Sequence, residues 1–368
     1  MAESRLDKVA AQGQSIWIDL LSRELVASGE LQRLIDEDAV TGLTSNPSIF
    51  QKAISSGGDY DAQIQELLEE TDDPHAIFTA LAVADVQAAC DVFRPIWERT
   101  NGADGYVSLE VDPTLASDTK ATFEQAVELH GKVDRPNVYI KIPATVEGLS
   151  AIEDCIAGGI PINITLIFSL ERYRNVAAAY LRGLARLQTD GGDLSKVHSV
   201  ASFFVSRLDT EADARLEALG NTELQGKLGI ANAKLAYKEF EEIFSGPVWD
   251  RLAAAGATAQ RPLWASTSTK NPAYRDVMYV EELIGPDTVN TMPLETVEAF
   301  QDHGEVRGDT VRDGFEEAEA FLRELAAAGV DYDDIVGVLE TEGVKKFTDA
   351  FDELIAGIEA RRGELAAR

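Results

Sequence analysis

The chain has few basic residues for its length. Its 368 residues include 33 Lys and Arg against 64 Asp and Glu, which leaves a formal net charge of −31 at pH 7. A protein that binds DNA or RNA needs clustered Lys and Arg to displace counterions, and no such basic run occurs. The same deficit disfavours an anionic membrane surface. An anionic small substrate stays compatible with this composition if a few cations gather at its site.

Cysteine and long apolar runs are also scarce. Cys90 and Cys155 lie far apart and form no CxxC motif, so a disulfide framework is not expected and a reducing, cytoplasmic compartment is favoured. The longest apolar stretch, around residues 160–168, is interrupted by polar residues and is too short to span a membrane. The first residues contain no apolar segment typical of a signal peptide. The four histidines have no metal-ligand spacing, so no metal site is expected.

Short runs rich in β-branched residues alternate with helical patterns along the chain. The predicted strands are 16–21, 40–45, 105–112, 137–144, 161–168, 199–208, 262–267 and 288–293. Amphipathic helical stretches lie between most of them, among others 118–131, 147–157, 170–187 and 211–244. This alternation predicts parallel βα units, and eight units predict an α/β fold of the (β/α)8 TIM-barrel type. A doubly wound sheet is the alternative, although no GxGxxG motif follows the first strand.

Two regions exceed the simple repeat. Residues 60–100 contain additional helix after the second strand, and residues 304–368 are predicted to be helical. No Ser/Gly linker or low-complexity tract separates either region from the rest. We therefore expect one domain over residues 1–368, with a barrel core at about 14–303 and a C-terminal helical extension.

Polar residues recur on one face of several predicted strands. Side chains alternate across a strand, so we expect the apolar face to pack under the helices and the other face to point into the barrel. Active sites of such barrels lie at the C-terminal strand ends. The polar residues that this rule places there are Asp19, Glu110, Lys141, Asn163 and Thr165.

Lys141, in the run YIKIPA, is the most informative of these residues. Burying an ammonium group is expensive, and desolvation favours the neutral amine, which is a nucleophile toward carbonyl groups. A buried Lys–Glu or Lys–Asp ion pair with a structural role is the alternative. The convergence of four further polar residues favours a catalytic site, because a buried polar cluster of that size is a poor source of stability.

A specific combination of motifs is spread over residues 16–293. Its segments are WIDLLSREL (17–25), GLTSNPSIF (42–50), VSLEVDP (107–113), YIKIPAT (139–145), INITLIFS (162–169), SFFVSRLD (202–209) and LWASTSTKNP (263–272). Together they resemble the transaldolase family, in its longer actinobacterial-type form, within the class I Schiff-base aldolase superfamily. The resemblance implies a (β/α)8 enzyme of the pentose phosphate pathway that needs no metal or organic cofactor.

The resemblance also implies a reaction and the residues that catalyse it. A dihydroxyacetone unit moves from a ketose phosphate (sedoheptulose 7-phosphate or fructose 6-phosphate) to an aldose phosphate (glyceraldehyde 3-phosphate or erythrose 4-phosphate). Lys141 would form the imine with the ketone carbon, and Asp19 would take the proton from the hydroxyl at the bond being cut. Glu110 and Thr165 would move protons through a water while the imine forms.

Further positions match substrate contacts of the family. The hydroxyls of the three-carbon unit would be held by Asn46, Asn163 and Ser202, with Phe204 in the same site. Sugar phosphates are the expected partners, and neither nucleic acid nor membrane is expected. The family contains monomers and larger assemblies, so a homo-oligomer is compatible with the resemblance, and the C-terminal helices could cover a barrel end or pack on a partner.

The phosphate of the substrate requires cations. Arg207 matches the phosphate arginine of the family, and its planar fork fits phosphate oxygens. Ser266 matches a second phosphate contact. The shorter transaldolases have an arginine where this chain has Ser268, and Lys270 is our candidate replacement, with a surface lysine as the alternative.

Two other functions are alternatives. A fructose 6-phosphate aldolase of the same superfamily would release free dihydroxyacetone, which requires protonation of the enamine carbon. The related aldolases have a tyrosine at the position of Phe204 and a glutamine at the position of Glu110, so both positions favour transfer. A non-catalytic phosphosugar-binding barrel predicts an incomplete catalytic set, whereas every expected polar residue is present.

Overall fold

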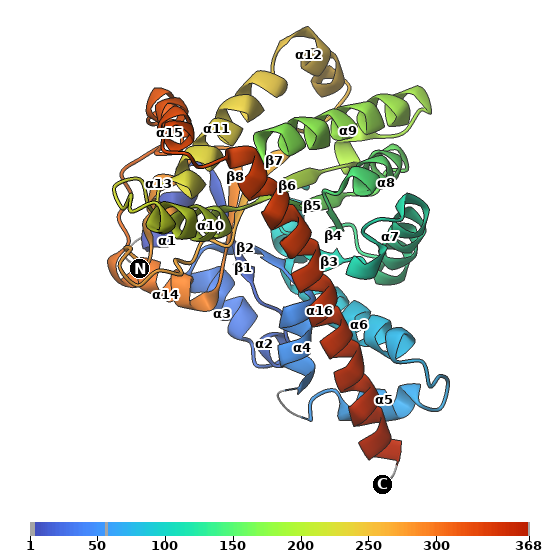
Figure 1. Cartoon of the computed structure of the whole chain (residues 1–368). Coiled ribbons are helices and arrows are strands. Elements are labelled where there is room, and N and C mark those ends of the chain that lie inside the picture. The colour runs from blue at the N-terminus through green and yellow to red at the C-terminus, as the bar shows by residue number, and fades with distance from the viewer. Residues whose placement is uncertain (1–3, 56–57, 367–368) are drawn as a thin grey trace.

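A closed barrel of parallel strands forms the centre of the protein (Figure 1). The structure is a computed structural model that describes residues 4–55 and 58–366. The strands are β1 (Gln14–Asp19), β2 (Val40–Thr44), β3 (Val107–Glu110), β4 (Val138–Pro143), β5 (Ile162–Ile167), β6 (Ser199–Phe204), β7 (Arg261–Ala265) and β8 (Thr288–Met292). Each strand pairs in parallel with its neighbour in chain order, and β1 closes the barrel by pairing with β8. The (β/α)8 prediction is confirmed, because a doubly wound sheet would leave two open edges.

Helices surround the barrel and extend it in the two predicted places. Those up to the fifth strand are α1 (Arg5–Ala10), α2 (Arg23–Ala27), α3 (Glu30–Glu37), α4 (Pro47–Ser55), α5 (Asp61–Leu67), α6 (Pro74–Arg99), α7 (Thr119–Val133) and α8 (Val146–Ala157). The later ones are α9 (Leu170–Thr189), α10 (Val205–Ala218), α11 (Leu228–Ile243), α12 (Gly246–Ala254), α13 (Met278–Glu282), α14 (Leu294–His303), α15 (Phe315–Ala327) and α16 (Tyr332–Ala366). The two predicted regions contain α5 and α6 after the second strand and α15 and α16 at the C-terminus, and further helices, such as α1 before β1 and α12 before β7, also exceed one helix per unit.

Two predicted boundaries around the sixth strand are wrong. The strand expected at 199–208 ends at Phe204, and α10 begins at the next residue, so the sequence VSRL is helical. The single helical stretch expected at 211–244 is two helices, α10 and α11. Gly220 follows the end of α10 with a φ of 70°, and the N–H of Asn221 bonds back to the carbonyl of Leu216. A glycine in this left-handed conformation ends a helix, which is why the apolar periodicity did not continue as one element.

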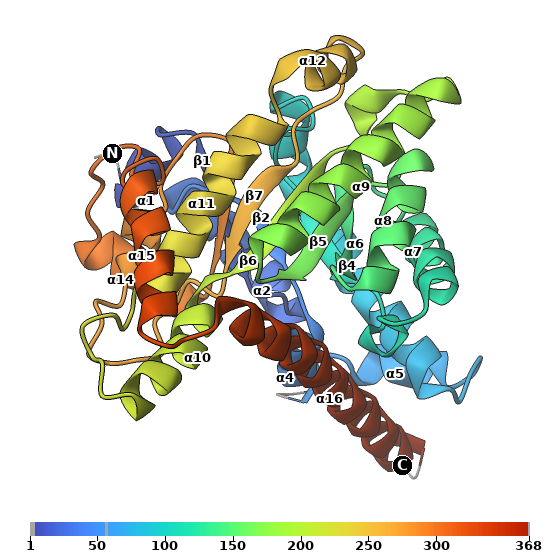
Figure 2. The same ribbon diagram turned by 45° about the horizontal axis from the view of Figure 1, so that its top comes forward.

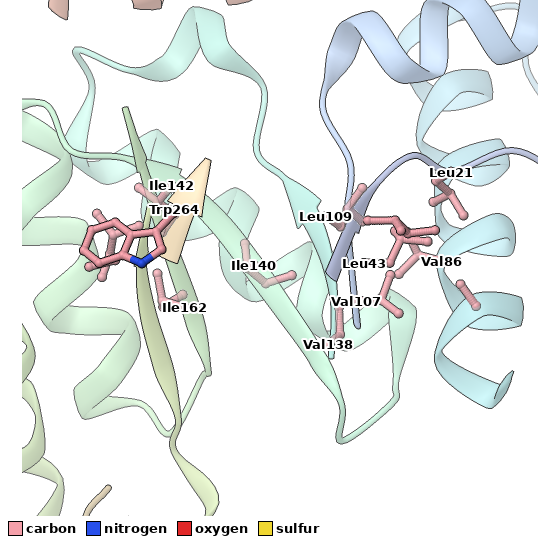
Figure 3. Close-up of a cluster of buried hydrophobic side chains, with 14 of the residues drawn as sticks. Leu21, Leu43, Val86, Val107, Leu109, Val138, Ile140, Ile142, Ile162 and Trp264 are labelled. Atoms are coloured by element: carbon pink, nitrogen blue, oxygen red, sulfur yellow. The ribbon is translucent and has the colours of Figure 1, made fainter. Parts of the chain in front are cut away.

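Alternation along the strands separates the core into two zones. Apolar side chains of β2, β3 and β4 point outward, and Figure 3 shows Leu43, Val107 and Leu109 against Val86 of α6. The inward positions near the N-terminal strand ends carry aromatic residues. Trp17 and Tyr139 are buried there, with ring centroids 6.1 Å apart. The barrel is therefore filled with side chains at this end, where Ser15 and Arg261 also lie, whereas the polar residues predicted for the site lie at the other end.

The helix α6 is long and apolar enough to cross a membrane, judged by length and composition alone, although half of the relevant window is buried inside the protein. Its apolar segment is longer than residues 160–168, the stretch that the sequence suggested as the longest apolar run. Ile77, Leu81 and Phe93 on this helix are buried in the core, and α6 packs against β3 and α7. This packing accounts for its apolar face.

The C-terminal extension ends in a 35-residue helix, α16, which crosses the barrel at the C-terminal ends of the strands (Figures 1 and 2). Ion pairs hold it along its length. Glu340 pairs with Arg172 of α9 at 2.9 Å, and Arg361 pairs with Asp61 of α5 at 2.6 Å. The extension therefore covers one end of the barrel of its own chain, one of the two arrangements expected from the sequence.

A substitution at Gly42 of β2 tests how tightly the side chains pack around Trp17 inside the barrel. A Cβ atom at this position would lie 2.4 Å from Cε2 of Trp17, a buried ring with no room to shift. We expect Gly42→Ala to lower the free energy of unfolding by about 1–3 kcal/mol, the usual cost of overpacking, in urea titrations. Gly337→Ala on the exposed face of α16, where a Cβ meets no atom within 4 Å, is the control and should stabilise by about 0.5–1 kcal/mol. Equal stability of the Gly42 variant and the wild type would contradict the described packing.

Candidate active site

A cavity of about 140 Å³ opens at the C-terminal ends of the barrel strands. Its lining comes from strands, from the loops that follow them, and from the C-terminal helix: Asp19, Thr44, Asn46, Lys141, Thr165, Ser202, Phe204, Arg207, Leu263, Ala265, Ser266, Ser268, Lys270, Thr291, Pro293 and Phe347. All the predicted site residues except Glu110 and Asn163 line this cavity. Predicted site residues as far apart in the sequence as Asp19 and Lys270, 251 positions, therefore meet at one end of the barrel.

Lys141 lies at the bottom of this cavity and is only 4% exposed. In the parallel pairing of β3 with β4, Glu110 stands opposite Lys141, so the two side chains lie next to each other on the inner face. The Lys141 Nζ is 3.0 Å from the Glu110 Oε2, and it also donates a hydrogen bond of 3.1 Å to the Ser45 carbonyl. The buried Lys–Glu pair that the sequence left open is thus present, but it borders a cavity and is not enclosed in the core.

Glu110 holds its proton unusually tightly. Burial raises the pKa of its carboxyl to about 7, and the positive charge of Lys141 opposes this rise. A carboxyl with such a pKa can both accept and release a proton near neutral pH. If the proton of the Lys141 ammonium moves to Glu110, a neutral amine and a neutral acid result, and the site no longer holds two buried charges. The geometry thus provides a route to a nucleophilic amine.

Asp19 lies at the end of β1, where hydrogen-bonded threonines hold its carboxylate in place. Thr44 Oγ1 donates a hydrogen bond of 2.7 Å to Asp19 Oδ1, and Thr44 lies 2.7 Å from the hydroxyl of Thr291 on β8. Burial raises the pKa of Asp19, whereas Lys141, the Thr44 hydrogen bond and Arg207 act in the opposite direction. Sequence reasoning missed Thr44 and Thr291, although the alternation along β2 and β8 places both on the inner face.

Thr165 and Asn163 occupy neighbouring inward positions on β5 but differ in their contacts. Thr165 Oγ1 is buried and has no hydrogen-bond partner among the described residues, so it is available to a molecule in the cavity. Asn163 lies below the cavity, where its Nδ2 donates to Ser108 Oγ at 3.0 Å and its Oδ1 accepts from Ser202 Oγ at 2.7 Å. In this structure Asn163 orients Ser202, which itself lines the cavity.

The predicted phosphate residues gather on the side of the cavity next to β6 and β7. Arg207 belongs to the first turn of α10, and its guanidinium lies 4.7 Å from the centre of the Phe204 ring. The hydroxyl of Ser266 is 2.8 Å from that of Ser206 on the same turn. Lys270 is exposed, lines the cavity and donates a hydrogen bond of 2.7 Å to Ser268. Its ammonium therefore lies at Ser268, the position that the resemblance singled out for a phosphate-binding cation.

The described part of the chain contains no evident group of metal ligands. Within residues 4–55 and 58–366, no three His, Cys, Asp or Glu side chains are grouped so that they could hold a metal ion. The chemistry that this cavity can support is that of an amine, two carboxyl groups and several hydroxyls, with cations at one side. Phe347 of α16 also lines the cavity. No local pattern in the sequence places it there, because its position depends on the path of the whole C-terminal extension.

Known proteins are similar to this chain over nearly its full length. The family model described as transaldolase/fructose-6-phosphate aldolase matches residues 16–358. "Transaldolase 2" of Streptomyces avermitilis is 52% identical over 364 residues, which is 98% of each chain. "Transaldolase" of Mycolicibacterium paratuberculosis is 52% identical over 362 residues, 97% of each chain, and that of Mycobacterium tuberculosis is 51% identical over 354 residues, 95% of each chain.

The raised pKa of Glu110 predicts a pH-dependent contribution to stability. Between about pH 4.5, its ordinary value, and about pH 7, the folded protein holds a proton that the unfolded chain has released. Stability from this group is therefore fully present below the lower value and decreases as the pH rises toward 7. We expect the free energy of unfolding of the wild type to fall relative to that of Glu110→Gln across this range, as measured by urea titration.

Glu324→Gln on the exposed surface of α15 is a matched control, because it makes the same substitution away from the cavity. A stability difference between wild type and Glu110→Gln that stays constant, or that grows in favour of the wild type as the pH rises, would contradict the described environment of Glu110.

Proposed function

Since this chain belongs to the transaldolase/fructose-6-phosphate aldolase family and is an enzyme with transaldolase activity, we propose that Lys141 carries this activity as a Schiff-base nucleophile. The enzyme acts on sugar phosphates, as its family does. It moves a dihydroxyacetone unit from sedoheptulose 7-phosphate or fructose 6-phosphate to glyceraldehyde 3-phosphate or erythrose 4-phosphate. The observation that carries the assignment is the Lys141–Glu110 pair at the base of an open cavity.

The first step is formation of the imine. Glu110 takes a proton from the Lys141 ammonium, and the free amine attacks the ketone carbon of the substrate to form a carbinolamine. Glu110 then returns a proton to the carbinolamine hydroxyl, with Thr165 assisting through a water, and water leaves. Nitrogen is now bonded to the former ketone carbon as a protonated imine. The raised pKa of Glu110 supports this double role, since the same group must accept and donate near neutral pH.

The second step is cleavage and transfer. The protonated imine accepts the electron pair of the adjacent C–C bond, while Asp19 takes the proton of the hydroxyl on the departing fragment. That fragment leaves as an aldose phosphate, and an enamine of dihydroxyacetone stays on Lys141. The enamine carbon then attacks the aldehyde of the acceptor, and Asp19 returns its proton to the new hydroxyl. Hydrolysis of the imine releases the new ketose phosphate.

The remaining residues bind the substrate. Asn46 and Ser202 hold the hydroxyls of the three-carbon unit, with Asn163 behind Ser202. Arg207 and Ser266 bind the phosphate, and Lys270 supplies a second cation beside Ser268. Lys141 and Arg207 line the same cavity, which supports one substrate reaching from the reacting carbon to the phosphate site.

The alternative, a fructose 6-phosphate aldolase that releases dihydroxyacetone, is not favoured. The similar proteins are named transaldolases, and the ring of Phe204 carries no proton to donate to the enamine. A non-catalytic barrel is not supported either, because three of the four proposed catalytic residues line one cavity and the fourth, Glu110, pairs with Lys141. We further propose that residues 1–368 form one domain.

The setting of the enzyme is also a proposal. We propose that it functions in the pentose phosphate pathway in the cytoplasm, which the two free, buried cysteines support. The net charge of −31 supports the absence of nucleic-acid and anionic membrane partners. Assembly into a homo-oligomer is compatible with this function.

Borohydride trapping tests the role of Lys141. Incubation with fructose 6-phosphate and borohydride should reduce the imine and attach a three-carbon unit to Lys141, as located by peptide mass mapping. Lys141→Arg should abolish the adduct. Lys234→Arg is the control, since Lys234 is another buried lysine with a carboxylate partner, Glu282, at 3.3 Å. An adduct on any other lysine would refute the mechanism.

Acceptor dependence separates transfer from release. With fructose 6-phosphate alone, formation of glyceraldehyde 3-phosphate should be negligible, and addition of erythrose 4-phosphate should start it, because only the acceptor frees Lys141 for another turnover. A coupled dehydrogenase assay measures this product. Phe204→Tyr should increase release without acceptor, since the phenol can protonate the enamine. Rapid release by the wild type would favour the aldolase.

A further inference from the structure

The aromatic ring of Phe347 lies between the two cationic groups of the cavity. Its centre is 5.4 Å from Lys141 Nζ and 5.9 Å from the Arg207 guanidinium carbon. The Phe204 ring packs edge to face against it at 6.3 Å. Phe347 is 6% exposed and lines the cavity, although it belongs to the C-terminal extension and not to the barrel. It therefore forms a lid of apolar surface over the reacting nitrogen.

The path of α16 fixes this ring in place. Gly343 lies one helical turn before Phe347, and a Cβ atom there would be 3.2 Å from Leu166 and 3.4 Å from Phe168. The absence of a side chain at Gly343 thus lets α16 approach the end of β5 closely. Glu340, almost one turn earlier, pairs with Arg172 of α9 at 2.9 Å. Beyond Phe347, Arg361 pairs with Asp61 of α5 at 2.6 Å, so the helix is held both before and after the ring, and Phe347 has little freedom to leave the cavity.

We infer that Phe347 is a specificity-determining residue that limits protonation of the Lys141 enamine carbon by water, so that the three-carbon unit is transferred and not released. The inference rests on the proposed Schiff base. Release requires that the enamine carbon takes a proton from water and that hydroxide then adds to the imine carbon, after which the C–N bond breaks and free dihydroxyacetone leaves. The net reaction consumes one water, and a buried ring over Lys141 restricts its access.

Phe347→Ala and Phe347→Leu test this inference. The measured quantity is the rate of dihydroxyacetone release without acceptor, divided by the rate of transfer to saturating erythrose 4-phosphate. We expect Phe347→Ala to raise this ratio several-fold, because the cavity opens to water above Lys141. Phe347→Leu keeps most of the apolar volume and should stay much closer to the wild type.

Phe351→Ala is the matched control for the stability of α16. Phe351 lies one turn after Phe347, is 5% exposed and packs against Phe78 of α6, away from the cavity. Its truncation should lower the thermal midpoint about as much as Phe347→Ala does, with the release ratio unchanged. If both alanine variants raise the ratio equally, loosening of the helix explains it and the inference is wrong.

The outcomes also separate this inference from the proposed function. If borohydride trapping gives no adduct on Lys141 of the wild type, the proposed Schiff base itself is refuted. A wild type that traps and transfers normally, together with an unchanged ratio in Phe347→Ala, would refute only the role of Phe347.

Discussion

A single ammonium group inside a barrel, that of Lys141, is the constraint on which the site depends. Because Lys141 is only 4% exposed, bulk water solvates its ammonium poorly, and the register between β3 and β4 supplies Glu110 at 3.0 Å as a partner. A buried ion pair contributes little net stability, because desolvation of both charges offsets their attraction. In the proposed mechanism its value is chemical: a proton passes from Lys141 to Glu110, and the amine is then free to react.

The rest of the barrel interior encloses the Lys141–Glu110 pair from below and from above. Below the pair, Trp17 and Tyr139 fill the barrel, and Gly42 leaves the space that the indole requires. Above it, α16 places Phe347 over the cavity. The reacting nitrogen thus lies between two layers of aromatic side chains, where the low dielectric strengthens each charged contact and raises the pKa of Glu110 and of Asp19.

Much of this arrangement follows from local sequence patterns. Period-two alternation places Asp19, Glu110 and Lys141 on the inner face of the barrel. In the structure Asp19 and Lys141 line the cavity, and Glu110 contacts Lys141 without lining the cavity itself. Patterns of this kind describe single helices and strands, so they do not predict which elements far apart in the sequence come into contact. The prediction extended the sixth strand through Arg207, because VSRL is apolar enough for a strand, whereas the chain turns into α10 directly after Phe204. The contact of Phe347 depends on the packing of α16 across the whole barrel, which no window of sequence contains.

The same burial explains how a protein with a large excess of acidic residues can accept an anionic substrate. A phosphate that approaches a protein of charge −31 is repelled at a distance, and at the site it meets two carboxyl groups, Asp19 and Glu110. Burial raises the pKa of both, so each carries less negative charge near neutral pH than an exposed carboxylate would. Arg207, Lys141 and Lys270 then outweigh them within the cavity. The desolvation that suits the two acids to the proposed proton transfers therefore also lowers the electrostatic barrier to an anionic substrate.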